Sequence, residues 1–276
     1  MNSQQNPEIG RSIQTGSIVT NYHDIGTGEP VLLLHGSGPG VSAWANWRLS
    51  IQSLKEDFRL LAPDMAGFGF SQTPSDIVYS RELWLEQIVA FLDAVGVDKV
   101  NVIGNSFGGS MALALAIHRP ERVNRLILMG SVGVNFELTP GLEAVWGYTP
   151  TEENMRSIMR IFAYDQNLVG DDLVRMRYEA SKRAGVQEAY SAMFPAPRQR
   201  WVEAMAHAEN DIRGIGHKTL LVHGRDDKVI PLATSLTMQD WIEDSQLHIY
   251  GRCGHWTQIE HAAAFCQLVT NFLKVA

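Results

Sequence analysis

Short apolar runs alternate with helical patterns through the first half of the chain, and this alternation is the feature that most constrains the fold. Val31–Leu34, Phe58–Ala62, Lys99–Ile103 and Arg125–Met129 are such runs. Between the second and the third, Arg81–Val95 places its large apolar residues at helical spacing. Strands that are apolar throughout and separated by helices predict a mostly parallel sheet, flanked by helices on both faces. The predicted fold class is therefore α/β.

The alternation changes at about residue 134, where strand patterns stop. Thr149, Pro150 and Glu152 predict a helix start, with the threonine as N-cap, the proline at the first helical position and the glutamate at the third. No strand pattern separates the helical segments that follow, which are roughly 152–164, 171–183 and 198–212. This stretch therefore predicts a block of helices inserted into the α/β alternation.

Strand patterns resume at Thr219–His223 and Gln246–Tyr250, and a last helix is expected at about 262–275. The sequence thus predicts one α/β core with a helical cap inserted into it. The expected boundaries are 1–133 and 212–276 for the core and 134–211 for the cap.

Composition excludes several classes of protein. With 45% apolar residues, the chain is too hydrophobic for intrinsic disorder, and its net charge of −7 argues against a nucleic-acid partner. Residues 1–10 lack a signal-peptide pattern, and the longest apolar runs, such as Met111–Ile117, are too short to span a membrane. Cys253 and Cys266 are too few for a disulfide scaffold. We expect a cytoplasmic protein with reduced thiols and no membrane partner.

Residues 104–108, Gly-Asn-Ser-Phe-Gly, fit the pattern G-x-S-x-G. The segment directly follows an expected strand and opens an expected helix, which is the context that this catalytic pattern requires. Its glycines permit a tight turn that lifts the Ser106 hydroxyl out of the sheet. We predict that Ser106 is a nucleophile, and the alternative is a glycine-rich turn with an incidental serine.

A serine nucleophile needs a base and an orienting acid, which in this architecture follow in the chain order serine, acid, histidine. His255 is the histidine that fits this order, on a loop after the last expected strand. Asp227 fits the register G-x-x-D-x-apolar-apolar-P after the strand 219–223. Asp226 is the alternative acid, although a turn or a surface charge is the more ordinary role for it.

Backbone amides are expected to hold the oxyanion of an acyl-transfer reaction. The amide of Phe107 follows the nucleophile, and the amide of Ser37 lies in the glycine-rich turn after the first apolar strand, with Gly36 and Gly38 as neighbours. The alternative is that these glycines only close a tight turn. His35 is expected to orient this turn.

A second glycine-rich segment begins at Asp64. This aspartate precedes the nucleophile and is out of triad order, so we interpret residues 64–71 as a structural loop. The chain has neither metal-ligand spacing nor a phosphate-binding glycine pattern, and we expect no metal and no nucleotide cofactor.

Together these segments resemble the α/β-hydrolase superfamily over the whole chain. More closely, the chain resembles the meta-cleavage product hydrolases of aromatic degradation, in their monocyclic branch. The matching segments lie in both the core and the expected cap, at 35–40 with 43–48, 104–109, 192–201 and 253–261. The resemblance implies an α/β-hydrolase fold with a cap and a homo-oligomer without cofactors. It also implies hydrolysis of a carbon–carbon bond in a 2-hydroxy-6-oxohexa-2,4-dienoate, giving 2-hydroxypenta-2,4-dienoate and a small carboxylic acid.

The resemblance also implies residues that bind this small-molecule substrate. Asn46 and Asn105 would hold the dienoate end, assisted by Trp256 and by an arginine of the cap, which matches Arg183 best and Arg177 next. An arginine suits a substrate carboxylate because it can form two parallel hydrogen bonds with it. In the alternative reading, the asparagines cap turns, Arg183 lies on a solvated helix face and Trp256 only packs beside the catalytic histidine.

The other end of such a substrate is expected to face apolar side chains, for which we name Trp146, Phe107, Leu142 and Val229. Two mechanisms stay open, one through an acyl enzyme on the serine and one through a gem-diol formed by water. Two other functions also remain possible: a carboxylesterase or lactonase of the same fold, and a non-catalytic hydrolase-fold receptor for a ligand.

Overall fold

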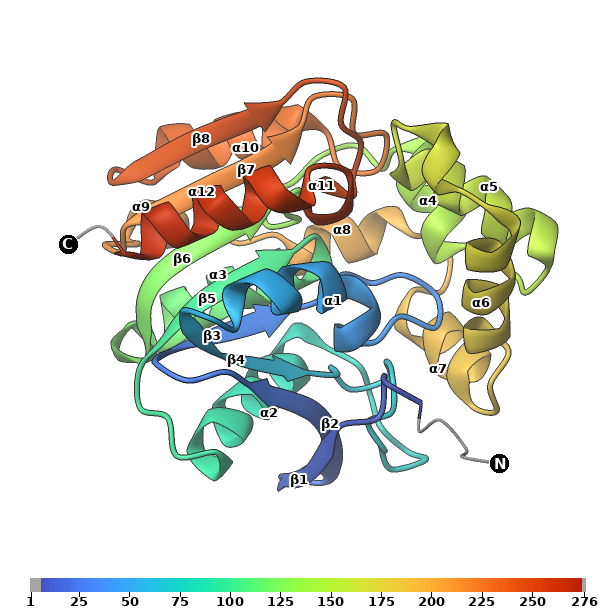
Figure 1. Cartoon of the computed structure of the whole chain (residues 1–276), viewed down its shortest axis with the longest axis horizontal. Coiled ribbons are helices and arrows are strands. Elements are labelled where there is room, and N and C mark those ends of the chain that lie inside the picture. Colours follow the sequence, from blue (N-terminus) through green and yellow to red (C-terminus); the bar gives the residue numbers. More distant parts are fainter. Residues whose placement is uncertain (1–5, 275–276) are drawn as a thin grey trace.

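The sheet runs through the middle of the molecule with helices on both sides (Figure 1), in a computed structural model that describes residues 6–274. Its strands are β1 (Arg11–Thr15), β2 (Ile18–Ile25), β3 (Glu29–Leu34), β4 (Phe58–Pro63), β5 (Val100–Asn105), β6 (Val123–Met129), β7 (Thr219–Gly224) and β8 (Ser245–Tyr250). Their order across the sheet is β1-β2-β4-β3-β5-β6-β7-β8. The pairs from β4 to β8 are parallel, whereas β2 is antiparallel to both of its neighbours.

Two sets of helices accompany the sheet. The helices outside the long insertion are α1 (Ala43–Leu54), α2 (Arg81–Ala94), α3 (Phe107–His118), α10 (Leu232–Trp241), α11 (Thr257–Glu260) and α12 (Ala262–Lys274), with the short η1 (Pro120–Arg122). Those between β6 and β7 are α4 (Pro140–Trp146), α5 (Glu152–Phe162), η2 (Gln166–Leu168), α6 (Asp171–Ser181), α7 (Val186–Met193), α8 (Gln199–Met205) and α9 (Glu209–Arg213). In Figure 1, α4, α5, α6 and α7 gather beside one end of the sheet.

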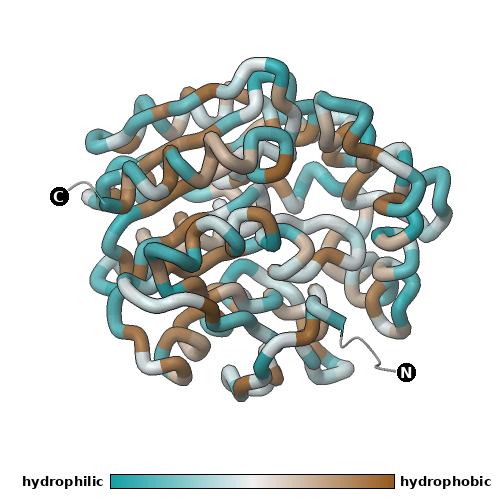
Figure 2. The backbone as a smooth tube through the Cα atoms, viewed as in Figure 1, coloured by the Kyte–Doolittle hydropathy of each residue, from teal (hydrophilic) through white to brown (hydrophobic). Residues whose placement is uncertain are grey.

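Strand β3 shows why both faces of the sheet are covered. Leu32 and Leu34 belong to one apolar cluster, and Val31 and Leu33 belong to the other, because successive side chains of a strand point to opposite faces. Figure 2 shows hydrophobic segments along the inner strands and polar ones along the outer turns. The sheet therefore has the buried, α/β character that the apolar runs predict.

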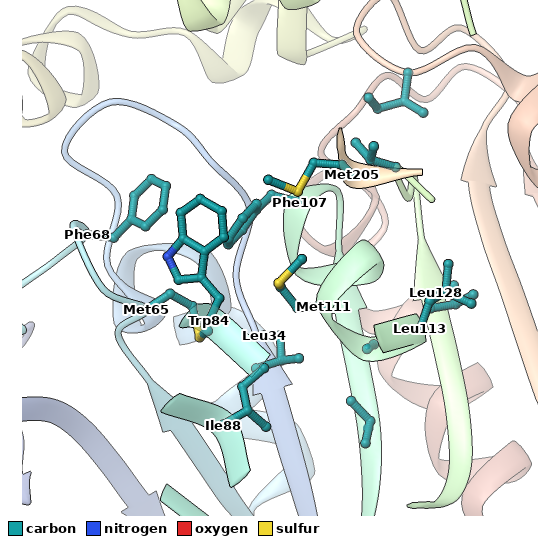
Figure 3. Packing of buried hydrophobic residues seen from close by; sticks show 14 of the residues in the cluster. Leu34, Met65, Phe68, Trp84, Ile88, Phe107, Met111, Leu113, Leu128 and Met205 are labelled. Carbon is teal, nitrogen blue, oxygen red and sulfur yellow. The ribbon is translucent and has the colours of Figure 1, made fainter. Parts of the chain in front are cut away.

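One of these clusters fixes the helix that follows the expected nucleophile. Phe107, the first residue of α3, packs edge-on against Trp84 of α2, with ring centroids 4.7 Å apart. It also lies 5.5 Å from the ring of Phe68 (Figure 3). Because Phe107 is buried in this packing, the turn just before it has a fixed position above the sheet.

The start of α5 differs from the expected one. The helix begins at Glu152, and its N-cap is Thr151, whose hydroxyl accepts a hydrogen bond from the N–H of Asn154. Thr149 instead accepts from the side-chain amide of Asn154. Both threonines are suitable N-caps, and Thr151, which directly precedes the helix, provides the cap. Pro150 therefore lies outside the helix rather than at its first position.

The helix expected at 198–212 is interrupted. After α8 ends, the N–H of His207 donates to the carbonyl of Gly133, and the carbonyl of Met205 accepts from the hydroxyl of Ser110 on α3. These bonds hold residues 206–208 against the core in a non-helical conformation. The chain then forms α9, which packs against α3 and α10. The expected boundary between residues 211 and 212 therefore falls inside a helix that lies on the core.

Candidate active site

Ser106 lies in the sharp turn between β5 and α3. Its backbone φ is +54°, a conformation that residues other than glycine rarely adopt, and its N–H donates to the carbonyl of Met129 at 2.9 Å. A side chain on Gly104 would collide with the backbone of Gly108, and one on Gly108 would collide with the carbonyl of Leu34. Glycines at both positions therefore allow the tight turn that a nucleophile elbow needs.

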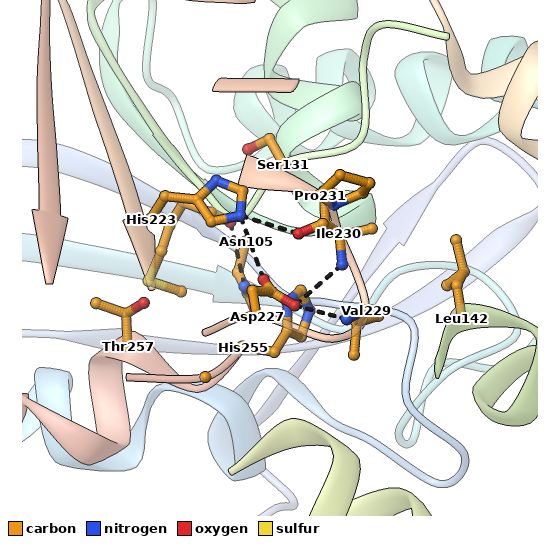
Figure 4. Close-up of polar contacts among 12 residues, drawn as sticks. Asn105, Ser131, Leu142, His223, Asp227, Val229, Ile230, Pro231, His255 and Thr257 are labelled. Atoms are coloured by element: carbon orange, nitrogen blue, oxygen red, sulfur yellow. Dashed lines mark hydrogen bonds and ion pairs between the residues drawn. The ribbon is translucent and has the colours of Figure 1, made fainter. Parts of the chain in front are cut away.

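Asp227 and His255 follow β7 and β8, and they meet beside this turn. Nδ1 of His255 donates to Oδ2 of Asp227 at 2.7 Å (Figure 4). The backbone N–H groups of Val229 and Ile230 donate to Oδ1 of the aspartate at 2.7 and 3.0 Å. Nε2 of His223 lies 3.4 Å from Oδ2. Four groups therefore fix this carboxylate in one orientation.

Asp226, the alternative acid, points elsewhere. Its carboxylate lies 3.6 Å from the guanidinium of Arg225, and its side chain is 31% exposed. Asp227 is only 1% exposed. The geometry thus places Asp227, and not its neighbour, against the histidine.

The charge of Asp227 is set by two opposing effects. Burial would raise the pKa of this carboxyl, but the charge of His255 and hydrogen bonds from His223 and His255 outweigh burial and hold the pKa well below its usual range. An ionised carboxylate keeps Nδ1 of His255 protonated, which leaves Nε2 as the basic nitrogen. The arrangement is that of a general base with its orienting acid.

A cavity of about 330 Å³ opens over these groups. Ser106, Asn105, Asn46, His255 and Trp256 line it, together with Gly36, Ser37 and Gly38 of the turn after β3. The rest of the lining is mostly apolar and comes largely from the inserted helices; it includes Leu142, Val145, Met155, Ile158, Met159, Phe162, Leu173 and Val229. Such a cavity suits a small molecule with one polar and one apolar end.

The turn at Ser37 is held from behind by two side chains of the inserted helices. The indole N–H of Trp146 donates to the Ser37 hydroxyl at 3.0 Å, and the hydroxyl of Tyr190 donates to the Ser37 carbonyl at 2.9 Å. Nδ1 of His35 donates to the carbonyl of Gly36 at 2.8 Å, so His35 does orient this turn. The amide predicted to hold an oxyanion is thus part of a well-fixed loop.

Two of the four predicted apolar contacts lie in the cavity wall, and two do not. Leu142 and Val229 line the cavity. The Phe107 side chain packs into the core, and Trp146 stacks on Phe194, with ring centroids 4.5 Å apart, behind the turn at Ser37. Trp146 thus lies outside the cavity lining and supports the turn, because its indole N–H donates to the Ser37 hydroxyl.

The two arginines named from the sequence lie in different places. Arg183 lies outside the cavity lining: it donates to the carbonyl of Gly69 at 2.9 Å, and its guanidinium lies 3.8 Å from the ring centroid of Phe70. Helix α6 ends at Ser181, so Arg183 follows the helix and reaches a neighbouring loop. Arg177, the second choice from the sequence, lies within α6 and lines the cavity.

Asp64 has the structural role that the sequence predicts. Its Oδ1 accepts the N–H of Ala43 at 2.6 Å, and its Oδ2 accepts the N–H of Phe70 at 2.8 Å and the side-chain amide of Asn21 at 2.7 Å. The carboxylate thus connects a loop, a helix start and a strand, away from the cavity.

Three residues near the site were not predicted from the sequence. Arg48 and Gln258 line the cavity, and both lie inside segments that carry the family resemblance, which was the signal that could have identified them. His223, in strand β7, contacts Asp227, and its Nε2 also donates to the carbonyl of Ile230 at 3.0 Å. No local pattern marks this last contact, because it depends on the turn after β7.

The loop that carries His255 is tied to the end of α5. The backbone N–H of His255 donates to the carbonyl of Phe162 at 2.7 Å. The carboxylate of Glu260 accepts the N–H groups of Gly254 and Tyr164, each at 2.7 Å. These bonds join the catalytic loop to the inserted helices through backbone groups on both sides.

Within residues 6–274, no group of three or more histidine, cysteine, aspartate or glutamate side chains is arranged to hold a metal ion. The helices of this same range include none that is long and apolar enough to cross a membrane.

Comparison with known proteins identifies the family. The model of the α/β hydrolase fold family matches residues 29–262. The chain is 57% identical over 277 residues to the 2-hydroxymuconate semialdehyde hydrolase of Pseudomonas sp. strain CF600, covering 100% of this chain and 98% of that protein. It is 58% identical over 268 residues to the 2-hydroxy-6-oxo-2,4-heptadienoate hydrolase of Pseudomonas putida strain F1, covering 97% of each.

Solved structures agree with this assignment. A mutant of the meta-cleavage product hydrolase CumD is 53% identical and superposes with a TM-score of 0.97, covering 98% of this chain and 100% of that one. A serine-to-alanine mutant of the same hydrolase, from Pseudomonas fluorescens IP01 and complexed with acetates, is 52% identical with a TM-score of 0.96, covering 97% and 98%. The chain therefore belongs to the α/β-hydrolase family and, within it, to the meta-cleavage product hydrolases.

Proposed function

We propose that the protein hydrolyses a carbon–carbon bond in 2-hydroxy-6-oxohexa-2,4-dienoates, giving 2-hydroxypenta-2,4-dienoate and a small carboxylic acid. The observation that carries this proposal is a single cavity with two chemically distinct ends. Ser106 and His255 line it beside the turn of Ser37, while Arg177 and two asparagines supply groups that suit a carboxylate and an enol oxygen. The names of the relatives described above support the same reaction.

The carboxylate end of the substrate is proposed to lie against Arg177, Asn46 and Asn105. Oδ1 of Asn46 accepts the N–H of Gly36 at 3.3 Å, and its buried Nδ2 has no hydrogen-bond partner within the described part of the chain. Buried donors without partners are rare in proteins, so this amide is suited to a ligand oxygen. Trp256 would pack along the flat conjugated chain of the substrate.

The proposed reaction adds one water molecule across the bond. His255 first moves the proton of the 2-hydroxyl group to carbon, which converts the dienol to a keto form. Attack on the distal carbonyl by Ser106 or by water then forms an oxyanion, which the amides of Ser37 and Phe107 would hold. The carbon–carbon bond breaks, its electrons pass into the conjugated keto acid, and the acyl carbon gains the oxygen of water, directly or through an acyl enzyme.

The inserted helices α4–α8 are proposed to be the cap that closes this cavity. Leu142 of α4, Met155 and Met159 of α5 and Arg177 of α6 all line it. Methionine side chains adapt to ligands of different shape, which suits a family whose substrates differ at the distal carbonyl.

We also propose that the enzyme is a cytoplasmic homo-oligomer. β8 is an edge strand of the sheet and carries Ile249, which is 40% exposed, and exposed edge strands in natural proteins are usually covered or protected. Cys253 and Cys266 are free and buried, as expected in a reducing compartment. Size-exclusion chromatography with light scattering would test the oligomer, and a monomer at micromolar concentration would contradict it.

The proposed reaction is tested with ring-fission products that differ only at the distal carbonyl, which carries hydrogen, methyl or a larger group. We expect rapid loss of their visible absorbance, with at least one of them turned over more efficiently than a neutral aryl ester. Faster hydrolysis of esters or lactones than of every dienoate would instead identify a carboxylesterase. Tight binding of dienoates without any turnover would identify a ligand receptor.

A further inference from the structure

Arg177 reaches the cavity as a nearly buried charge, and its guanidinium has two partners in the N-terminal part of the chain. Its Nη2 donates to the carbonyl of Gly40, and its ionic partner is Glu8. Its Nη1 donates to Oε1 of Glu8 at 3.3 Å, and each of the two side chains is only 13% exposed. A guanidinium removed from water needs an opposite charge nearby. Arg48, which also lines the cavity, and Arg183 repel Arg177 electrostatically, whereas Glu8 attracts it. Glu8 is thus the counter-ion that stabilises Arg177 beside two other arginines.

The second oxygen of Glu8 contacts the core side of the cavity. Its Oε2 accepts the hydroxyl of Ser42 at 2.6 Å. Ser42 is the N-cap of α1, where its hydroxyl accepts the N–H of Ala45 at 3.1 Å and its carbonyl accepts the N–H of Asn46 at 3.1 Å. One carboxylate therefore contacts both Arg177 and the helix start that carries Asn46.

The backbone around Glu8 is fixed as well. The side-chain amide of Asn21 on β2 donates to the carbonyl of Glu8 at 3.0 Å and accepts the N–H of Gly10 at 2.9 Å. The same amide donates to the buried Asp64. The N-terminal segment is thus anchored on the sheet before it reaches the inserted helices, so the position of Glu8 does not depend on Arg177.

We propose that Glu8 is a positioning residue for substrate binding: it orients Arg177 from the inserted helices and the start of α1 from the core toward the same substrate carboxylate. This inference rests on the proposed function. It assigns the N-terminal segment, residues 6–10, to the architecture of the substrate site rather than to the periphery of the fold.

The test replaces Glu8 by glutamine, which keeps its shape and removes its charge. For 2-hydroxy-6-oxohepta-2,4-dienoate, we expect Glu8→Gln to raise KM by roughly tenfold, as loss of a charged hydrogen bond does, with kcat changed by less than about twofold. Turnover of a neutral aryl ester should not change, because it carries no carboxylate for Arg177. Glu8→Asp keeps the charge on a shorter side chain and should give an intermediate KM.

Glu179→Gln is the matched control: Glu179 lies on α6 and pairs with Lys182, as Glu8 pairs with Arg177, but its side chain is 60% exposed. This variant should leave KM and kcat unchanged. In an Arg177→Gln background, Glu8→Gln should raise KM by less than its roughly tenfold effect in the wild type, because only the part exerted through Ser42 and α1 remains. An unchanged KM in Glu8→Gln, an equal loss with the ester, or full additivity with Arg177→Gln would overturn the proposal.

Failure of the proposed function would be visible separately, as an absence of dienoate turnover in the wild type. In that case, binding of 2-hydroxypenta-2,4-dienoate followed by tryptophan fluorescence replaces KM as the readout. We expect its Kd to rise by roughly tenfold in Glu8→Gln. Equal affinity in wild type and Glu8→Gln, with equal melting temperatures, would then overturn the role of Glu8.

Discussion

The cavity has two walls: one belongs to the α/β core and the other to the inserted helices. The two walls carry different kinds of side chain. The core wall carries Ser106 and His255, with Asp227 buried behind the histidine, and all three follow strands of one sheet and are held by backbone hydrogen bonds. The inserted wall carries Arg177 and a set of apolar side chains on helices. We infer that the core wall provides the chemistry and the inserted wall provides selectivity. Changes in the core wall should therefore affect every substrate, and changes in the inserted wall only some.

The largest effect is expected at the nucleophile. Ser106→Ala should lower kcat by roughly 10⁴-fold or more for dienoates and for a neutral aryl ester, because both reactions need the same group. Stopped-flow absorbance and ester hydrolysis measure the two rates. The control is Ser131→Ala, which removes a buried hydroxyl without a hydrogen-bond partner in residues 6–274 and should leave both rates unchanged. Full activity in a folded Ser106→Ala protein would refute the assignment.

The orienting acid should give the next largest effect. Asp227→Asn should lower kcat by roughly 10³–10⁴-fold on both kinds of substrate, because an amide does not hold His255 in the required tautomer. The neighbouring Asp226 provides the control, since it is partly exposed and pairs with Arg225. If Asp226→Asn were the more damaging of the two substitutions, the triad would have to be reassigned.

The inserted wall is tested at Arg177, and Arg183, which lies outside the cavity, serves as the comparison. Arg177→Gln should raise KM for dienoates by roughly 10–100-fold and leave ester hydrolysis unchanged, because it removes a charged donor from the carboxylate site. Arg183→Gln should change KM by less than about threefold, since Arg183 contacts the loop at Phe70 outside the cavity. Steady-state kinetics on both substrates distinguish the two. A larger effect from Arg183 would restore the original assignment from the sequence.

The smallest expected effect concerns stability, at His207, where residues 206–208 pack against the core. Burial lowers the pKa of His207 from 6.5 to about 4, although a hydrogen bond to the carbonyl of Ser110 opposes this shift. The unfolded chain therefore binds a proton that the folded protein does not. This contribution to stability is complete above about pH 6.5 and is lost as the pH falls toward 4, by at most about 1.4 kcal/mol per pH unit.

His207→Gln removes this titration, and the difference between the two proteins cancels other groups, such as Asp64, whose pKa burial raises to about 7. Urea unfolding at several pH values should show a gap in the free energy of unfolding that widens from pH 4 to 6.5 and is constant above. A gap independent of pH would show that His207 binds its proton equally well in the folded and unfolded states, which would contradict the lowered pKa.

The same division explains which parts could be predicted from sequence. Ser106 and Asp227 lie in short patterns whose spacing encodes a turn, so the core wall could be derived residue by residue. The inserted wall could not, because the choice between Arg177 and Arg183 depends on where α6 ends and how it docks. The fold class was predicted for a similar reason: its apolar runs are local signals.

Elements without such a signal were not recognised. β2 contains His23 and Asp24 among apolar residues, and α1 mixes two tryptophans with Asn46, so neither has a clean period. The contact between Glu8 and Arg177 joins positions 169 residues apart, and no pattern along the chain encodes it. These two elements and this contact depend on how distant segments pack together, and no single segment of the sequence encodes that packing.

The hydrogen bond from the backbone N–H of His255 to the carbonyl of Phe162 has a consequence for the entry of substrate and the release of products. If α5 swung outward to admit a molecule, it would pull the catalytic histidine away from its carboxylate in the same motion. We infer that α5 is a fixed part of the site rather than its moving lid, so that entry of substrate beside α5 would leave His255 aligned with Asp227.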